Sequence, residues 1–148
     1  MTVIEFFKLQ AKNLNKDVKT IYIDEEGYYD FKPKYFEDIY NILYDWNFSP
    51  KEIGENKQQF SLMKAQHIIA QWVGCKNWSD LIHSSNERLE LKKSLFEHRD
   101  DMFYNGSWNE PFIQSWLLYE EMYLSNGKFD DSAKLEIYKQ IYLKENNN

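Results

Sequence analysis

Glycine, proline and cysteine are scarce in this chain of 148 residues, which holds 5, 3 and 1 of them, respectively. Strands that follow one another closely need turn residues, so the shortage of glycine and proline disfavours a fold of many strands. A single cysteine excludes a disulfide within the chain and favours a reducing compartment. Chains of this length bury a sufficient core without crosslinks, so we expect one folded domain over residues 1–148.

Basic residues and long apolar runs are also in short supply. The 18 Lys and Arg are outnumbered by 24 Asp and Glu, which gives a formal charge of −6. A negative protein repels phosphate, and no window of the sequence holds a basic stripe, so a nucleic-acid partner is not expected. Polar residues interrupt the longest apolar stretches, and the first residues lack a signal-peptide pattern. We therefore expect a soluble, cytoplasmic protein without a membrane segment.

Apolar residues recur at helical spacing through most of the chain, which predicts a mainly α fold, a compact multi-helix bundle. The region 20–31 holds two β-prone runs around a polar loop and is expected to form a short β-hairpin or a loop. We expect N-terminal helices and this hairpin over 1–58, a helical module over 59–104, a C-terminal helix pair over 105–144 and a disordered tail over 145–148. The predicted helices cover 3–17, 34–46, 62–73, a short segment capped by Asn77, about 85–103, and one segment each after Asn109 and Asp130.

One motif resembles a known module: Ser61-x-x-x-Ala65-Gln66-x-Ile-Ile-Ala, followed by Gly74-x-x-x-Trp78-x-x-Leu81. The pattern resembles a small helical unit of bacterial proteins that is found attached to glyoxalase-superfamily and uncharacterised proteins. The resemblance covers about a fifth of the chain and implies a structural unit, without an activity or a cofactor. Read physically, Ala65 permits close helix approach, Gly74 ends the helix in a left-handed conformation, and Trp78 closes the corner. Gln66 is expected to be buried and bonded to the backbone of a neighbouring loop.

The positions of the histidines and of the cysteine indicate structural roles rather than catalytic or metal-binding ones. His67 lies on a polar stripe, His83 follows a helix end, and His98 is expected to be half-buried beside apolar neighbours. Cys75 is expected to be a small buried side chain, since it lacks metal ligands at zinc-site spacing. Residues 97–101 are densely ionisable but, on a helix, would point in different directions into solvent. We expect no catalytic site, no metal and no cofactor.

The chain has 10 Phe, 5 Trp and 11 Tyr, or 18% aromatic residues, and those of its last third exceed what one helix face can bury. They form either a thick aromatic core or an interface for a protein partner or a second copy of the chain. The leading hypothesis is a non-catalytic binding protein of inhibitor, immunity or antitoxin type. The alternatives are single-stranded nucleic-acid binding through stacked aromatics and an enzyme that uses His98 with Asp100 or Asp101. The candidate interface residues are Trp108, Phe112, Trp116, Tyr119, Tyr123, Tyr138 and Tyr142.

Overall fold

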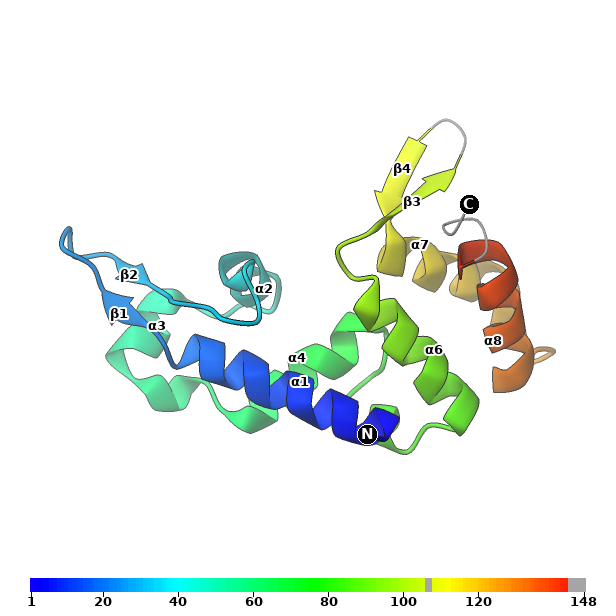
Figure 1. Ribbon diagram of the computed structural model, residues 1–148, viewed down its shortest axis with the longest axis horizontal. Helices are drawn as coiled ribbons and strands as arrows, with labels where there is room; N and C mark the ends of the chain where they lie inside the picture. Colours follow the sequence, from blue (N-terminus) through cyan, green and yellow to red (C-terminus); the bar gives the residue numbers. More distant parts are fainter. Residues whose placement is uncertain (106–107, 144–148) are drawn as a thin grey trace. The chain divides into compact units, whose positions relative to one another are not determined.

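The computed structural model describes residues 1–105 and 108–143, with the side chains of Asn105 and Trp108 excepted. The described chain is mainly helical and carries two small antiparallel hairpins (Figure 1). The predicted fold class is therefore confirmed. The chain divides into two compact units, Met1–Ile69 and Ala70–Asn148. The prediction of a single domain stays a prediction, and the expected tail over 145–148 lies outside the described residues.

The first unit begins with its longest helix, α1 (Val3–Val18), which confirms the helix predicted there. Thr2 and Glu5 form a capping box at its start, because each side chain accepts a hydrogen bond from the other residue's backbone N–H. Phe7, Ala11, Leu14 and Val18 recur on one face and are fully buried. This spacing turns one side of α1 to the core and leaves the opposite side to solvent.

A hairpin follows, with β1 (Tyr22–Ile23) paired to β2 (Tyr29–Asp30), as expected for the 20–31 region. Asp24 orders its loop by accepting the N–H groups of Glu26 and Tyr28, both at 2.9 Å. The hairpin packs on α3 (Pro50–Glu55), where Gly54 leaves room for the ring of Tyr29. A two-stranded hairpin of this size is stabilised by such packing rather than by its own ladder.

The helix predicted over 34–46 is shorter than expected, since α2 spans only Ile39–Asp45. The buried carboxylate of Asp17 explains the difference. It accepts the backbone N–H groups of Lys34, Tyr35 and Phe36 at 2.7–2.9 Å and holds this segment as a turn. The unit then continues through α3 and the 3₁₀ turn η1 (Lys57–Gln59) into α4 (Leu62–Trp72), within which the boundary between the units falls.

The second unit contains α5 (Trp78–Ile82), α6 (Asn86–Glu97), α7 (Phe112–Tyr119) and α8 (Asp131–Tyr138). Asn77, Ser85 and Asp130 cap three of these helices, as their sequence signals predict. Both α7 and α8 continue as π-helical segments, η2 (Glu120–Leu124) and η3 (Lys139–Leu143). Helix α6 contacts both α7 and α8, and Figure 1 shows the three side by side.

A second hairpin replaces structure that was predicted to be helical. Helix α6 ends at Glu97 instead of near 103, and β3 (Met102–Asn105) pairs with β4 (Trp108–Pro111). The residues Asn109 to Pro111, expected to open a helix, lie in β4, and α7 starts one residue later. The predicted turn at 105–107 falls largely outside the described residues.

Candidate functional site

The C-terminal aromatic residues proposed as an interface mostly form the core of the second unit. Phe112, Trp116 and Tyr138 are fully buried, and Tyr142 is nearly so. The ring of Trp116 lies 5.1 Å from that of Tyr138 and 5.3 Å from that of Tyr142, both edge-on. This corrects the interface prediction at these four positions, because a partner cannot reach them in the folded unit.

The polar ends of the two buried tyrosines are satisfied inside this core. The Tyr142 hydroxyl lies 2.8 Å from Ser115 Oγ, and the Tyr138 hydroxyl lies 2.8 Å from Ser94 Oγ. Burial raises the pKa of Tyr138, which keeps the phenol neutral. These hydroxyls therefore fix the packing of η3 and α8 against α7 and α6.

Three further members of the predicted set remain. Tyr123 is 58% exposed and Tyr119 is half-buried, whereas the side chain of Trp108 lies outside the described residues. Leu118 and Met122 are exposed beside them on α7 and η2. Among the members of the predicted interface whose side chains the structure describes, only Tyr119 and Tyr123 are accessible.

The motif residues fill structural positions. Ala65 and Leu81 are fully buried, Trp78 is half-buried, and the Ser61 hydroxyl accepts the N–H of Lys64 at the start of α4. Gly74 has φ +85°, and a Cβ placed there would lie 2.4 Å from Leu117 Cδ2. The cap at Ser61 and the left-handed Gly74 are as expected, whereas the roles of Ala65 and Trp78 stay predictions.

Gln66 differs from the expectation. Its side chain is partly exposed, and no hydrogen bond joins its amide to the residues that the structure describes. The buried face that the helical spacing predicted is formed by Ile68 and Ile69, which are fully buried. Gln66 therefore lies at the edge of the buried face of α4.

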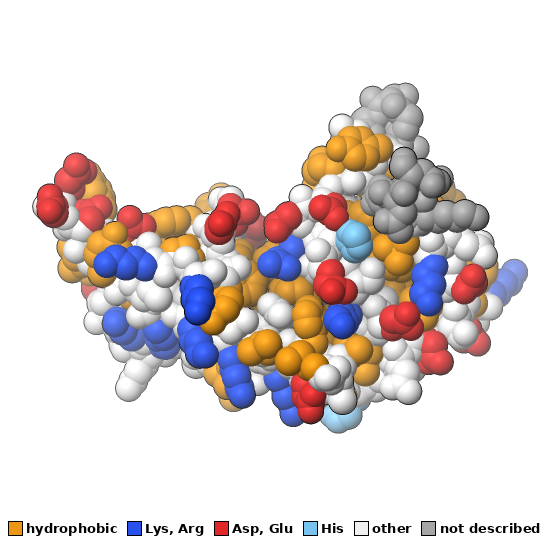
Figure 2. Space-filling model, in the orientation of Figure 1, with side chains coloured by type: hydrophobic (Ala, Val, Ile, Leu, Met, Phe, Trp, Pro, Cys, Tyr) orange, Lys and Arg blue, Asp and Glu red, His pale blue; other side chains and the backbone are white. Residues whose placement is uncertain are grey.

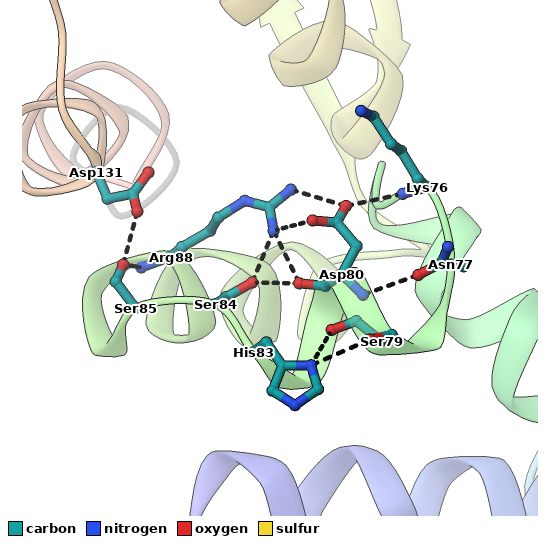
Figure 3. A network of polar contacts seen from close by, with 9 residues as sticks. All are labelled: Lys76, Asn77, Ser79, Asp80, His83, Ser84, Ser85, Arg88 and Asp131. Atoms are coloured by element: carbon teal, nitrogen blue, oxygen red, sulfur yellow. Dashed lines mark hydrogen bonds and ion pairs between the residues drawn. The ribbon is translucent and has the colours of Figure 1, made fainter.

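A polar network joins α5 to α6 and α6 to α8 (Figure 3). The Asp80 carboxylate accepts the backbone N–H of Lys76 at 2.9 Å and pairs with Arg88 Nη1 at 3.2 Å. These contacts, with that of Lys76 the larger, lower the pKa of Asp80. Ser85 donates to Asp131 at 2.7 Å. The groups in Figure 3 pair with one another, which indicates a structural brace between the helices.

The cysteine and two of the histidines lie as predicted. Cys75 is buried, and its burial raises the pKa of the thiol. His67 is exposed. His83 caps α5, with its Nδ1 atom 2.9 Å from the carbonyl of Ser79 (Figure 3). Among the described residues, no group of three His, Cys, Asp or Glu side chains is arranged to hold a metal ion.

His98 is half-buried, as predicted, but it has a partner that was not expected. Its Nδ1 atom lies 2.6 Å from Asp101 Oδ2, and its ring stacks on Phe112 at 4.9 Å. The prediction that residues 97–101 diverge on a helix is wrong, because α6 ends at Glu97 and the chain turns back. Asp100, the other suggested partner, is exposed. The catalytic alternative thus reduces to one histidine–carboxylate pair.

The first unit carries a surface that sequence reasoning missed. We define the tyrosine surface as the exposed side chains of the first hairpin and α2: Tyr22, Ile23, Tyr28, Tyr40 and Tyr44. Asp30 joins its two elements, since its carboxylate accepts the Tyr40 hydroxyl at 2.7 Å and the Tyr22 hydroxyl at 3.4 Å. Burial and Asp30 raise the pKa of Tyr40 to about 12. The bond from Tyr40 lowers the pKa of Asp30.

An open depression continues this surface past the end of α2. It measures about 470 Å³ and is lined by Tyr44, Asp45, Asn47, Phe48 and Ser49. Asn47 shapes it by adopting a left-handed conformation with φ +61°. The depression lies beside Tyr44, which is 81% exposed.

A signal for the tyrosine surface was present in the sequence. Tyr40 and Tyr44 are four residues apart, opposite to the buried Ile39, Ile42 and Leu43, so they share the outer face of a helix. Only the structure shows that Tyr40 reaches the hairpin, because the contact joins residues 30 and 40 through the turn held by Asp17.

No family model, curated protein or solved structure matches this chain. The resemblance of the motif at 61–81 to a bacterial helical module therefore stays a prediction. In the part of the chain that the structure describes, no helix is long and apolar enough to span a membrane.

Proposed function

We propose that this protein is a non-catalytic binding protein whose contact site is the tyrosine surface of the first unit, and that its partner is a basic protein segment. The observation that carries the proposal is the exposure of large aromatic side chains among carboxylates that form no ion pair with the described residues. Tyr28 is 68% exposed and Tyr44 is 81% exposed. Tyrosines supply rigid contact area at low entropic cost and are enriched among the residues that dominate binding energy.

The charge around this surface favours a basic partner. Residues 22–48 hold two basic side chains, Lys32 and Lys34, against a larger set of acids: Asp24, Glu25, Glu26, Asp30, Glu37, Asp38 and Asp45. Figure 2 shows acidic side chains gathered over the hairpin at the upper left of the view. Complementary charge speeds encounter and rejects acidic competitors. An inhibitor, immunity or antitoxin role against a basic protein is consistent with this arrangement.

The surface is also ordered before binding. Asp24 fixes the hairpin loop, and Asp30 ties the hairpin to α2 through Tyr40. A surface that is already ordered loses less conformational entropy when it binds. The pair His98–Asp101 does not by itself specify a reaction, and we propose no catalytic activity for it.

The test compares two pairs of exposed tyrosines. Tyr28→Ala/Tyr44→Ala removes the two most exposed tyrosines of the proposed site, and Tyr104→Ala/Tyr123→Ala removes two exposed rings, 66% and 58%, from the second unit. Each protein is used to capture partners from the native host, and affinity for the recovered partner is measured at low and high salt. We expect the first variant to lose at least about tenfold in affinity and the second to bind like the unaltered protein.

The control variant Tyr104→Ala/Tyr123→Ala also tests the hypothesis that the aromatic residues of the last third of the chain form the interface. Loss of binding only in Tyr104→Ala/Tyr123→Ala would contradict our proposal and move the interface to the second unit. Light scattering on all three proteins adds a further outcome. Self-association that disappears in Tyr28→Ala/Tyr44→Ala would mean that the occupant is a second copy of the chain and not a basic partner.

A further inference from the structure

Helix α1 presents a row of lysines that the overall negative charge conceals. Lys8, Lys12, Lys16 and Lys19 follow one another at intervals of three or four residues, which places them on one face of the helix. At 1.5 Å per residue the row is about 16 Å long. The opposite face of α1 is buried in the core, so this face is the one that meets solvent.

Two lysines from other segments extend the row at its C-terminal end. Lys19 Nζ donates to the carbonyls of Lys57 and Phe60, and Lys64 Nζ donates to the carbonyl of Gln59. Burial lowers the pKa of Lys19, and repulsion from Lys57 and Lys64 lowers it further, so the three ammonium groups lie close enough to interact. We call the whole set the lysine surface: Lys8, Lys12, Lys16, Lys19, Lys57 and Lys64.

No carboxylate neutralises this surface in the part of the chain that the structure describes. The ion pairs Arg88–Asp80, His98–Asp101, Lys134–Glu120 and Lys139–Glu90 all lie in the second unit. Glu5, on the same side of α1 near its start, is held by the capping box. Figure 2 shows basic side chains gathered over α1 in the lower left of the view, with acidic ones elsewhere on the first unit. Crowded ammonium groups that face no carboxylate among the described residues favour an anionic ligand.

Aromatic rings lie beside lysines where α1 ends. Lys32 Nζ lies 4.9 Å from the centre of the Tyr22 ring, and Lys34 Nζ lies 5.3 Å from that of Tyr35. Both tyrosines are more than one-third exposed. The backbone of these lysines is attached to the end of α1 and the residues that follow it, because the side chains of Thr20 and Asp17 accept their N–H groups. Two exposed rings, those of Tyr22 and Tyr35, therefore lie beyond the C-terminal end of α1, each beside a lysine.

This combination favours one class of polyanion. Surfaces that bind single-stranded nucleic acid combine a basic track for phosphates with aromatic rings on which bases stack. A membrane-binding helix instead exposes a broad apolar face, and α1 has buried that face in the core. We propose that the lysine surface binds the phosphate backbone of single-stranded nucleic acid, with Tyr22 and Tyr35 as stacking positions. The site is distinct from the buried C-terminal aromatics first considered for this role.

The salt dependence of binding gives a quantitative test. Each neutralised phosphate on a single strand contributes about −0.7 to the slope of log K against log salt. Six lysines predict a slope of about −4 for a fluorescein-labelled oligothymidine, and Lys8→Gln/Lys12→Gln/Lys16→Gln predicts a slope of about −2. The matched control is Lys76→Gln/Lys128→Gln/Lys139→Gln, which changes the net charge equally at exposed lysines of the second unit.

Each outcome decides the proposal. A reduced slope in the α1 variant together with an unchanged slope in the control supports it. Equal weakening in both variants, or no binding at low salt with protein at tens of micromolar, would overturn it. Duplex of the same length serves as a second probe, and tighter binding to duplex would contradict the single-stranded assignment. Vesicles containing phosphatidylserine are the third probe, and binding to these but not to the oligonucleotide would assign the surface to membranes.

Discussion

Lys92 has the least favourable environment of the lysines in the described chain. Its side chain is 2% exposed on α6, and burial lowers its pKa from 10.5. The charged form is therefore penalised in the folded state and not in the unfolded state. We predict that Lys92→Met, which keeps the length of the side chain, raises the free energy of unfolding at pH 7 by about 1 kcal/mol or more. Urea denaturation measures this change, with the exposed Lys128→Met as control.

The sign of the pH dependence follows from the same pKa. Because the unfolded chain binds the Lys92 proton more tightly, the unaltered protein gains stability as pH rises from the lowered folded pKa towards 10.5. Above 10.5 both states are neutral at this group, and the penalty disappears. The advantage of Lys92→Met should therefore shrink as pH approaches 10.5. A variant less stable than the unaltered protein at pH 7 would show that nearby acids such as Glu120 outweigh burial.

A comparison of Gly74 with Gly127 separates the stability cost of a left-handed backbone from that of a steric contact. Gly74 and Gly127 have φ of +85° and +81°, but only at Gly74 would a Cβ meet another atom, Leu117 Cδ2. Gly127→Ala is predicted to cost about 1–2 kcal/mol, from the backbone alone. Gly74→Ala should cost about 1 kcal/mol more, because Leu117 must move. Thermal unfolding of both variants measures the difference. Equal losses of stability would show that the contact with Leu117 contributes nothing.

At the scale of elements, the carboxylate of Asp17 determines where α2 begins. It accepts three backbone N–H groups of the 34–36 turn while fully buried. Asp17→Ala leaves those donors without partners and is predicted to cost about 3 kcal/mol or more. Asp38→Ala is the control, since Asp38 stands at the start of α2 without a side-chain capping bond. Similar losses of stability in the two variants would contradict this role for Asp17.

The helix starts could be predicted because their signals are local. Thr2, Asn77, Ser85 and Asp130 each cap a helix through a backbone N–H three residues later, and the sequence contains all of this information. The start of α2 could not be predicted in this way. It depends on Asp17, which lies seventeen positions before the turn, with the whole first hairpin between them.

The second hairpin was missed for a related reason. Met102 and Phe103 continue the helical spacing of Leu95 and Phe96, so the pattern predicted one long helix. The structure ends α6 at Glu97, and Phe103 instead stacks on Tyr142 at a distance of 4.2 Å. A tertiary contact outweighed the local periodicity. The dipeptide Asn105-Gly106, a strong hairpin signal between two short runs, was the clue that could have identified the strands.

At the scale of the whole molecule, net charge and aromatic count do not predict where the charged and aromatic surfaces lie. The formal charge of −6 includes six lysines that three segments bring together, and no window of the sequence contains them all. The aromatic excess of the last third fills the core of the second unit. The accessible tyrosines in the first unit come instead from a hairpin and a short helix. The sequence thus predicted the helical class of the fold but not the position of the candidate site.

The two proposed surfaces differ in charge and share only Tyr22, which neither set of substitutions changes, so the two losses of binding should be separable. We predict that Lys8→Gln/Lys12→Gln/Lys16→Gln weakens binding to oligothymidine and leaves the affinity for a basic protein partner within about twofold. Tyr28→Ala/Tyr44→Ala should do the reverse. Added salt should weaken both interactions, because each depends on opposite charges across an exposed contact. The measurement is a titration of both variants with both ligands at two salt concentrations. If either variant lost both activities while keeping the unfolding transition of the unaltered protein, the two ligands would share one site, and the assignment of separate surfaces would fail.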